Sequence, residues 1–513
     1  MVLGAKLNMA NGIREFGHAC PDRIAVVDGD RSFTFGALHE RSSRLASALL
    51  DSGLRPGDAV AVLSGNRAEY FEIATALAKA GLPMVALNPK NQLKDNEFIV
   101  GHSDARALIL DADLVANAES LIDSLDVVSS FDGRVGGDYE SMLEGATARD
   151  PRVDVGDEDT FAISYTSGTT GLPKGVTLSH RGRVLTNYAA AIDFGLGPTR
   201  QTVAVAPLYH GAGFAFAFIG PQLGGTVWVQ RSWDPEEFLR LLETSRANSV
   251  FLVPTHAHQV RRITEDPMSS YDLTALETIY FNAAALPVVL KEWVHEALPH
   301  VGLHEIYGST ECSVVTNLRP PDAMRKAGSV GHPWFMNEVR LLDDDGQEVP
   351  PGVPGELFAR SPMLMTGYFR DEAATAKATN ADGFVTVEDV AVRDDEGFIS
   401  IVDRKKDMII SGGVNIYPRE IEEVLARHAD VDDVAVIGLP DDAYGERIAA
   451  FVVPRKGLEG IDFQSLESHA RAGVATYKVP REWHVVDSLP RNPSGKILKR
   501  DIRANHESTS SER

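Results

Sequence analysis

The chain has 513 residues, of which 43% are hydrophobic and 24% are charged, as in soluble globular proteins. Its formal net charge of -23 disfavours non-specific binding to nucleic acid or to an anionic membrane. An acidic protein that binds a polyanion must therefore build a local cradle for it. Cys20 and Cys312, the only cysteines, exclude a disulfide framework and a zinc–thiolate cluster and fit a reducing compartment.

The first residues lack the long apolar core of a signal peptide. The most apolar stretch, residues 211–225, is interrupted by glycines and by Pro221, and is too short for a clear membrane span. We therefore expect a cytoplasmic protein without a membrane-spanning segment.

Helical and strand patterns alternate in the first part of the chain. Residues 34–53 carry apolar residues at helical spacing and end at a glycine, residues 58–66 form a strand pattern, and residues 68–81 form another helical pattern. This alternation predicts an α/β architecture with a largely parallel sheet. The polar, glycine-rich residues 130–160 are predicted to form a surface excursion.

A loop rich in glycine and threonine follows, within the sequence ISYTSGTTGLPKGVTLSH of residues 163–180. It lies after a strand-like run and before residues 176–192, which we expect to become helical. A strand, a flexible loop and a helix are the usual setting for phosphate recognition. The loop lacks the Walker A spacing, and the chain has no Gly-x-Ser-x-Gly nucleophile elbow. For such a loop taken alone, a solvated connector is the alternative.

The C-terminal part has its own pattern. Residues 403–413, with sequence DRKKDMIISGG, are typical of a junction, and a small α/β unit of about a hundred residues follows. We therefore expect one domain over residues 1–402 and another over residues 403–513. The polar residues 505–513 are expected to be disordered.

Four further motifs occur in a set order after the loop. They are PLYHGAGF at residues 207–214, YGSTE at residues 307–311, the segment 383–413, and PRNPSGKILKRDIR at residues 490–503. With the loop, they resemble the core motifs of the superfamily of adenylate-forming acyl-CoA synthetases, peptide-synthetase adenylation domains and luciferases. The resemblance covers nearly the whole chain. It implies a large N-terminal domain of mixed sheets flanked by helices and a small mobile C-terminal α/β domain.

Such enzymes join a carboxylic acid to a thiol in two steps. The carboxylate attacks the α-phosphorus of ATP to give an acyl-adenylate and pyrophosphate, and the thiol of CoA then displaces AMP. Because carboxylate and triphosphate are both anions, the first step needs charge neutralisation and positioning. The resemblance implies Mg²⁺ as cofactor.

The resemblance assigns the phosphates to the loop. Its hydroxyls can donate to phosphate oxygens, its glycines let the backbone close around them, and its lysine adds positive charge. Glu311 and Thr166 are expected to hold Mg²⁺, and Thr310 to contact the α-phosphate. Taken alone, Glu311 would be a surface carboxylate. The expected phosphate-binding residues of the loop are Thr166, Ser167, Gly168, Thr169, Thr170, Gly171 and Lys174.

The nucleoside is expected to lie against a second group of residues. By resemblance, Asp389 binds the ribose hydroxyls and Arg404 supports ribose and phosphate, while the expected adenine contacts are Tyr307, Gly308, Asn282, Ala283 and Ala284. The chain departs from the family pattern twice here. Val387-Glu388-Asp389 stands where relatives usually have Thr-Gly-Asp, which puts bulk and charge beside the ribose. FNAAALP at residues 281–287 replaces the usual Gly-Gly-Ala-Pro.

The C-terminal motif supplies the expected catalytic lysine, Lys496, whose ammonium could reach both the carboxylate and the α-phosphate. A lysine in a basic C-terminal helix would otherwise be merely solvated. The resemblance also implies rotation of the small domain about a hinge at Asp403. This rotation turns Ser411, Gly412 and Gly413 toward the active site for the thioester step.

The acyl group is expected to lie near His210, which in relatives lines the path shared by acyl group and thiol. Residues 204–230 contain no Asp, Glu, Lys or Arg, so a pocket wall formed there would favour an apolar fatty, alicyclic or aryl acid. Tyr209, Phe214 and Phe216 are the pocket candidates. A buried core helix without substrate contact would explain the same absence of charge.

Three functions remain open from the sequence. A free-standing acyl-CoA ligase is favoured, and a stand-alone adenylation enzyme that loads a carrier protein and a non-catalytic nucleotide-binding homologue are the alternatives. Luciferase-like oxidation would use the same residues. Apolar patches on the helices would serve a homodimer interface as readily as a core, so the oligomeric state stays open.

Overall fold

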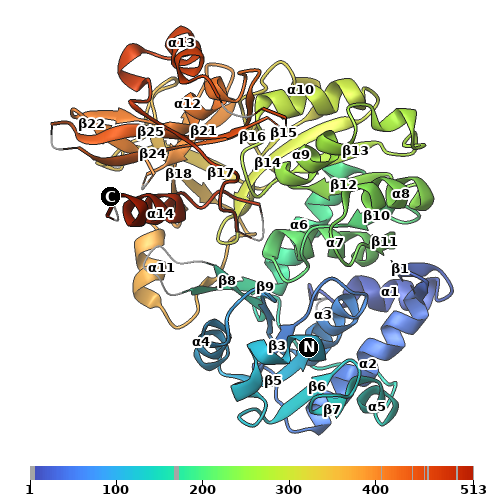
Figure 1. Ribbon diagram of the computed structural model, residues 1–513. Coiled ribbons are helices and arrows are strands. Elements are labelled where there is room, and N and C mark those ends of the chain that lie inside the picture. The colour runs from blue at the N-terminus through green and yellow to red at the C-terminus, as the bar shows by residue number, and fades with distance from the viewer. Residues whose placement is uncertain are drawn as a thin grey trace.

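The computed structural model describes residues 6–166, 173–405, 407–441, 443–455, 457–458, 461–492 and 495–511, with residues 507–511 by backbone alone. Figure 1 shows a large body from the N-terminus to the yellow part of the chain and a smaller orange-to-red group of elements beside it. The expected α/β class is confirmed. The helices are α1 Asn11–Ala19, α2 Phe35–Asp51, α3 Glu69–Ala80, α4 Leu93–Ser103, α5 Tyr139–Glu144, α6 His180–Phe194, α7 Gly211–Gln222, α8 Pro235–Ser245, α9 Pro254–Ile263, α10 Val288–Ala297, α11 Glu372–Ala378, α12 Pro418–Leu425, α13 Phe463–Gly473 and α14 Lys499–Ser511.

The first sheet has nine strands. Its central strands run parallel, as the helix–strand alternation predicts, and antiparallel strands close both edges. In spatial order they are β16 His332–Pro333, β15 Ser313–Leu318, β14 Gly302–Ser309, β13 Thr278–Phe281, β12 Ser249–Leu252, β10 Gln201–Ala204, β11 Thr226–Val229, β1 Ile24–Asp28 and β2 Arg31–Thr34.

The second sheet has eight strands, and its edge carries the glycine-threonine loop. In spatial order they are β19 Gly367–Tyr368, β9 Lys174–Ser179, β8 Thr160–Thr166, β4 Met84–Leu87, β3 Ala59–Leu63, β5 Ala105–Leu110, β6 Val127–Ser130 and β7 Gly137–Asp138. One core cluster joins the two large sheets through α2, α3 and α7, where Phe71 and Phe218 stack at 6.1 Å between ring centroids.

Two smaller sheets follow along the chain. An antiparallel sheet comprises β17 Glu338–Leu342, β18 Gly355–Arg360, β20 Val385–Arg393 and β21 Ile399–Arg404. The last sheet comprises β23 Val414–Ile416, β22 Ile409–Ser411, β25 Gly445–Pro454, β24 Val431–Asp441 and β26 Glu482–Val485. The last sheet has core clusters of its own, made up of residues between 409 and 502, so the fold comprises a large N-terminal part and a small C-terminal part.

Three local expectations were wrong. Of residues 176–192, expected to become helical, residues 176–179 instead belong to β9, which pairs antiparallel with β8 in a buried sheet, and the helix begins only at His180. The segment 130–160 contains β7 and α5, whose Tyr139 is fully buried. The expected disordered tail is helical to Ser511, because Ile502 anchors α14 in the core of the small part.

The apolar segment of residues 211–225 contributes α7, which packs inside the large part. Among the described residues, none of the helices combines the length and the apolar character needed to cross a bilayer.

A buried carboxylate ties the first sheet to α3. Asp28 at the end of β1 is fully buried and accepts hydrogen bonds from Arg231 Nε at 2.7 Å, Arg31 at 2.6 Å and the Ala68 backbone N–H at 3.1 Å. Burial opposes its ionisation, but these hydrogen bonds outweigh that effect and lower the pKa of Asp28. The ionised carboxylate thereby joins segments that are far apart in the sequence.

We expect Asp28→Ala to lower the free energy of unfolding by about 3 kcal/mol, because charge-assisted hydrogen bonds are lost in a buried position. Asp132→Ala removes an exposed partner of Arg134 and serves as the matched control, with a far smaller effect. Urea unfolding followed by circular dichroism measures both variants. Equal losses in the two would contradict a special role for the buried carboxylate.

Candidate active site

Several expected residues lie at one edge of the first sheet. β12, β13 and β14 are parallel neighbours, so the residues after their carboxyl ends share this edge. Asn282 follows β13, and Thr310 and Glu311 follow β14. The start of α7 lies there too, since a Cβ added to Gly211 would be 3.8 Å from Thr310 Oγ1. Open α/β sheets usually bind their ligands at such an edge.

Glu311 and Lys174 are brought together by a tyrosine that the sequence analysis missed. Tyr368 donates a hydrogen bond from its hydroxyl to Glu311 Oε1 at 3.1 Å, and Lys174 Nζ lies 4.9 Å from the centre of the same ring. Burial and the charge of Glu311 both raise the pKa of Tyr368, so it stays a donor at neutral pH. Tyr368 thus contacts the Glu311 carboxylate through its hydroxyl and the Lys174 ammonium through its ring.

Thr166 and Lys174 are paired across the hairpin, at the end of β8 and the start of β9. The residues between them that we expect to bind phosphate, Ser167, Gly168, Thr169, Thr170 and Gly171, lie outside the described residues. The described ends therefore fix where the loop leaves and rejoins the second sheet.

Asp389, Tyr307 and Arg404 form a second group. Asp389 Oδ2 accepts a hydrogen bond from the Tyr307 hydroxyl at 2.7 Å, and Arg404 Nε lies 3.1 Å from Asp389 Oδ1. Burial and the neighbouring carboxylate raise the pKa of Tyr307. Asp389 and Arg404 are opposite each other on β20 and β21, so their pairing follows from strand register. The group holds a buried carboxylate oriented by two donors.

The departure at Glu388 has a backbone explanation. Glu388 adopts φ of 65°, in the left-handed region where glycine is favoured and where relatives usually have one. Its carboxylate lies 3.0 Å from Lys377 Nζ on α11, and its N–H donates to Thr386 Oγ1. The chain therefore keeps the glycine-like conformation without the glycine and directs the added charge to a lysine.

The departure at residues 281–287 follows the same logic. Ala283 adopts φ of 73°, and its N–H donates to the side-chain oxygen of Asn282, which is buried. Ala283 and Ala284 are partly exposed beside it. A small side chain thus replaces glycine in a strained turn at the carboxyl end of β13. Gly308 is a true requirement, because an added Cβ would be 2.0 Å from the Ser313 carbonyl oxygen.

His210 immediately precedes the first turn of α7. Burial lowers the pKa of His210, so its imidazole is neutral at pH 7. A neutral histidine at this position can accept or donate a hydrogen bond but adds no charge.

A small apolar pocket of about 10 Å³, the space of about one water molecule, lies between α7 and the first sheet. Phe216 forms one wall, with its ring 4.6 Å from Phe251 and 5.2 Å from Tyr280 between centroids. The buried Tyr280 hydroxyl lies beside the hydroxyls of Thr202 and Ser249, and burial raises the pKa of Tyr280. Phe214 points elsewhere and packs with Phe161 and Phe218, and Tyr209 packs beside the same cluster. The full lining is Thr202, Val203, Ala204, Val205, Ala206, Gly213, Phe216, Ala217, Phe251 and Tyr280.

The lysine motif is docked on the same edge of the first sheet. Thr255, in the first turn of α9, donates from its hydroxyl to the Gly495 carbonyl oxygen at 3.4 Å. Gly495 has φ of 81°, and an added Cβ would be 2.7 Å from Thr255 Oγ1, so only glycine fits without adjustment. The N–H of Lys496 donates to Asn492 Oδ1 at 2.9 Å, which ties the lysine backbone into the turn. Lys496 precedes α14, so it is not a lysine on a solvated C-terminal helix, which was the alternative interpretation from the sequence.

Further polar contacts join the small part to α9 and α10. Asp432 pairs with Arg262 and lies 3.6 Å from His258, and Glu423 accepts from the Val288 backbone N–H at 3.4 Å. Asp403, on β21, accepts from the Arg419 backbone N–H at 3.3 Å. Gly412 and Gly413 form the exposed turn between β22 and β23, after Ser411.

Comparison with known proteins identifies the family. Residues 13–369 match the AMP-binding enzymes, and residues 420–496 match the AMP-binding enzyme C-terminal domain. The chain belongs to the AMP-binding enzyme family. It is 36% identical over 487 residues to a feruloyl-CoA synthase from an Amycolatopsis species, with 94% of this chain and 96% of that protein covered.

Two further AMP-binding enzymes are similar over almost their whole length. The indoleacetate–CoA ligase of Aromatoleum aromaticum is 35% identical over 497 residues, which cover 94% of this chain and 95% of the relative. The amide bond synthetase McbA from Marinactinospora thermotolerans has a solved structure with a TM-score of 0.88 at 29% identity, covering 97% of this chain and 99% of that one. The sequence-based identification of an AMP-forming acid ligase is thus confirmed.

Tyr368 is the clearest residue of this AMP-binding enzyme that sequence reasoning missed. It lies in TGYF, outside the motifs used for the resemblance, and reaches Glu311 only because β19 pairs with β9. This strand pairing joins residues nearly two hundred positions apart in the sequence, and no local sequence pattern predicts it. Tyr280 was missed for the same reason, as it faces the pocket from β13.

We expect Asp389→Ala to raise the dissociation constant for AMP by about 10- to 100-fold, because a hydrogen bond to a charged group is worth about 1.5–3 kcal/mol. Asp395→Ala, in the exposed turn after β20, is the matched control and should leave the constant unchanged. Isothermal titration calorimetry with AMP measures both. Unchanged affinity in the Asp389 variant would remove this residue from the nucleotide site.

Proposed function

We propose that the chain is an ATP-dependent acid–thiol ligase that joins an aryl or alicyclic carboxylic acid to CoA. One observation carries this proposal: two groups of polar side chains lie close to the carboxyl end of β14. Glu311, Tyr368 and Lys174 suit the triphosphate, and the Asp389 group suits the ribose. The apolar pocket beside α7, of about 10 Å³, would have to widen before it could take the acid.

In the first step a carboxylate oxygen of the acid forms a bond to the α-phosphorus of ATP while the bond to pyrophosphate breaks. Thr310 and the hairpin loop, with Lys174, position the phosphates. Lys496 approaches from the docked small part and offsets the negative charge shared by carboxylate and phosphate. The contact between Gly495 and Thr255 supports this assignment, since it holds the lysine turn at the sheet edge.

The residues fit a hard divalent cation. Glu311 offers a carboxylate, and Thr166 a hydroxyl, and Mg²⁺ is typically held by one or two carboxylates together with substrate phosphates. When bound, the ion would neutralise phosphate charge. Tyr368 orients the Glu311 carboxylate for this role through its hydrogen bond.

In the second step the thiol of CoA attacks the acyl carbon and AMP leaves. Rotation of the small part about Asp403, with residues 1–402 on one side and 403–513 on the other, would withdraw Lys496 and bring the turn of Ser411, Gly412 and Gly413 toward the site. The strand position of Asp403, immediately before the small part, supports a hinge there.

The substrate class follows from the pocket and the relatives. The pocket lining carries aromatic rings and no charged side chain, so a second carboxylate would lack a counter-ion. Two of the relatives are named for aromatic acids, feruloyl and indoleacetate, and others for an alicyclic acid and a fatty acid. An aromatic acid is favoured over a fatty acid because Phe216, Phe251 and Tyr280 offer ring faces and edges.

The acceptor distinguishes the alternatives. A carrier-protein thiol would use the same first step, and the amide bond synthetase among the structural relatives is named for another product. A panel of aryl, alicyclic and fatty acids with ATP, Mg²⁺ and CoA, read by mass spectrometry, tests the proposal. Acyl-CoA and AMP formed with an aryl or alicyclic acid support it. Acid-dependent AMP without acyl-CoA favours another acceptor, and silence across the panel favours a non-catalytic homologue.

Lys496→Ala should reduce acid-dependent ATP–pyrophosphate exchange by at least about 100-fold, the usual cost of removing a group that stabilises transition-state charge. Transfer to CoA from a synthetic acyl-adenylate should persist, because the lysine serves only the first step. Arg500→Ala, a nearby exposed cation, should retain both activities. Equal loss of both half-reactions in the Lys496 variant would contradict the division of roles.

Phe216→Ala should enlarge the pocket and shift acid preference. We expect kcat/KM to fall about 10-fold for the preferred acid, since aromatic packing is lost, and to rise for bulkier acids. Phe214→Ala removes a ring from the same helix but outside the pocket lining. If Phe214→Ala changed the preference order and Phe216→Ala did not, the pocket would be misassigned.

A further inference from the structure

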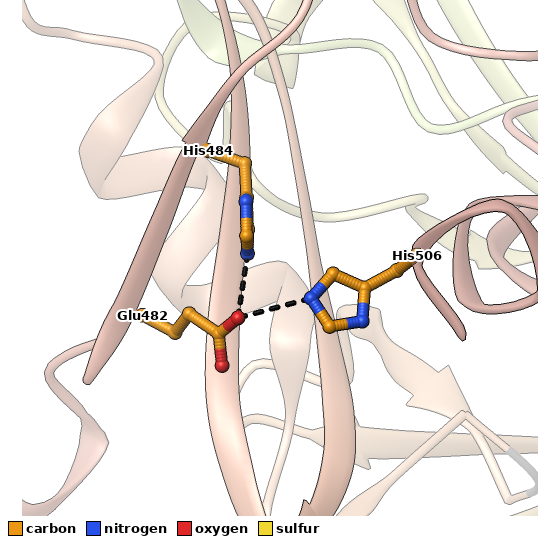
Figure 2. Close-up of side chains that lie close together, drawn as sticks. All are labelled: Glu482, His484 and His506. Carbon is orange, nitrogen blue, oxygen red and sulfur yellow. Dashed lines mark hydrogen bonds and ion pairs between the residues drawn. The ribbon is translucent and has the colours of Figure 1, made fainter. Parts of the chain in front are cut away.

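A cluster of two histidines and one glutamate lies in the small part, outside the nucleotide site. Figure 2 shows Glu482 and His484 on β26 and His506 on α14, with both imidazoles directed at one carboxylate. His484 Nε2 lies 2.8 Å and His506 Nε2 3.0 Å from Glu482 Oε1. The potential ligand atoms all lie within 4.8 Å of one another. Neither the resemblance nor the proposed ligase chemistry uses these residues.

The fold places these side chains together by simple periodicities. Glu482 and His484 are two residues apart on a strand, so they project from the same face of the sheet. His506 is four residues after Ile502 on α14, and Ile502 is buried against that sheet with Phe451, so both helix positions face it. Phe451 lies opposite His484 on β25, and the two rings stack at 4.6 Å.

The carboxylate is held in place from its other side. Arg447 Nε lies 2.7 Å from Glu482 Oε2, which leaves Oε1 for the two imidazoles. Arg447 also donates to the Pro440 carbonyl oxygen, so the guanidinium is itself fixed. Such outer contacts orient metal-binding carboxylates in many proteins.

We propose that Glu482, His484 and His506 bind a zinc-like divalent transition-metal ion. Two imidazole nitrogens and one carboxylate oxygen form a donor set that suits Zn²⁺ with a fourth position open to water. Bond lengths of about 2.0–2.2 Å to a tetrahedral ion separate ligand atoms by about 3.3 Å. The two imidazole–carboxylate separations of 2.8 and 3.0 Å therefore need a slight opening, and the two imidazole nitrogens, which lie within 4.8 Å of each other, must settle at a similar separation around the ion.

The site would cross-link α14 to β26. α14 begins three residues after Lys496, and its first residue, Lys499, lies 2.9 Å from Glu422 on α12. An ion bound to His506, seven residues further along α14, would attach the helix to the sheet at a second point. Its effect is therefore expected on the order of α14 and on the stability of the small part.

The test uses the full chain without a histidine affinity tag, stripped with a chelator and dialysed. Zn²⁺ is titrated in competition with a chromogenic chelator in the presence of excess Mg²⁺, and Co²⁺ is added separately as a visible-absorption probe. We expect one high-affinity Zn²⁺ per chain, a Co²⁺ ligand-field spectrum, and a higher melting temperature with the metal. Hydrogen exchange of α14 should slow in the metal-bound protein.

His484→Gln and His506→Gln should each abolish the stoichiometric site, and Arg447→Gln should weaken it by about 10- to 100-fold as an orienting residue. His469→Gln is the control, because it alters a second histidine pair in the same unit that contacts a backbone carbonyl. Circular dichroism and AMP binding establish that each variant is folded. Absence of stoichiometric binding in the unaltered chain, or binding that survives both histidine substitutions, overturns the proposal.

Discussion

The pairing of β19 with β9 is the constraint on which the candidate site depends. β9 pairs with β8 on one side and with β19 on the other. Because β19 contains Tyr368, this pairing places the Tyr368 ring beside Lys174 and Glu311. Glu311 itself comes from the other large sheet, at the end of β14. The hydrogen bond from the Tyr368 hydroxyl, together with one from the Met365 N–H to the Glu311 carbonyl oxygen, therefore ties Glu311 to the segment around β19. The register of β19 on β9 thus determines where the Glu311 carboxylate is held.

The sequence predicted the class of fold and most of the groups at the sheet edge, because motifs of this kind are local. Thr310 and Glu311 directly follow one strand, and Asn282 directly follows another. Their place at the end of a strand can therefore be predicted from the order of residues in the chain. Contacts such as Tyr368 with Glu311 require knowledge of which distant strands pair, and propensity does not supply it. The hairpin illustrates the same limit: residues 174–179 precede a real helix, but pairing with β8 decides that they are a strand.

Two departures from the family pattern acquire a physical meaning only with the backbone in view. Glu388 and Ala283 both adopt positive φ, the conformation that the usual glycines would adopt freely. From the sequence, Glu388 looked like added bulk beside the ribose. Its pairing with Lys377 explains how the charge is accommodated, while Asp389 keeps its two donors. Conformation has been retained at both positions although the residue type has changed.

The contacts that seat the small part on α9 and α10 have a consequence for its behaviour in salt. Asp432 with Arg262 and His258, Glu423 with the Val288 N–H, and Thr255 with Gly495 are all polar, and several lie near solvent. Of these contacts, Asp432 with Arg262 is the ion pair between two permanently charged side chains, and such a pair near solvent contributes little and weakens as the salt concentration rises. Added salt should therefore loosen the contact of Asp432 with α9 while leaving the neutral hydrogen bond from Thr255 to the lysine turn largely unchanged.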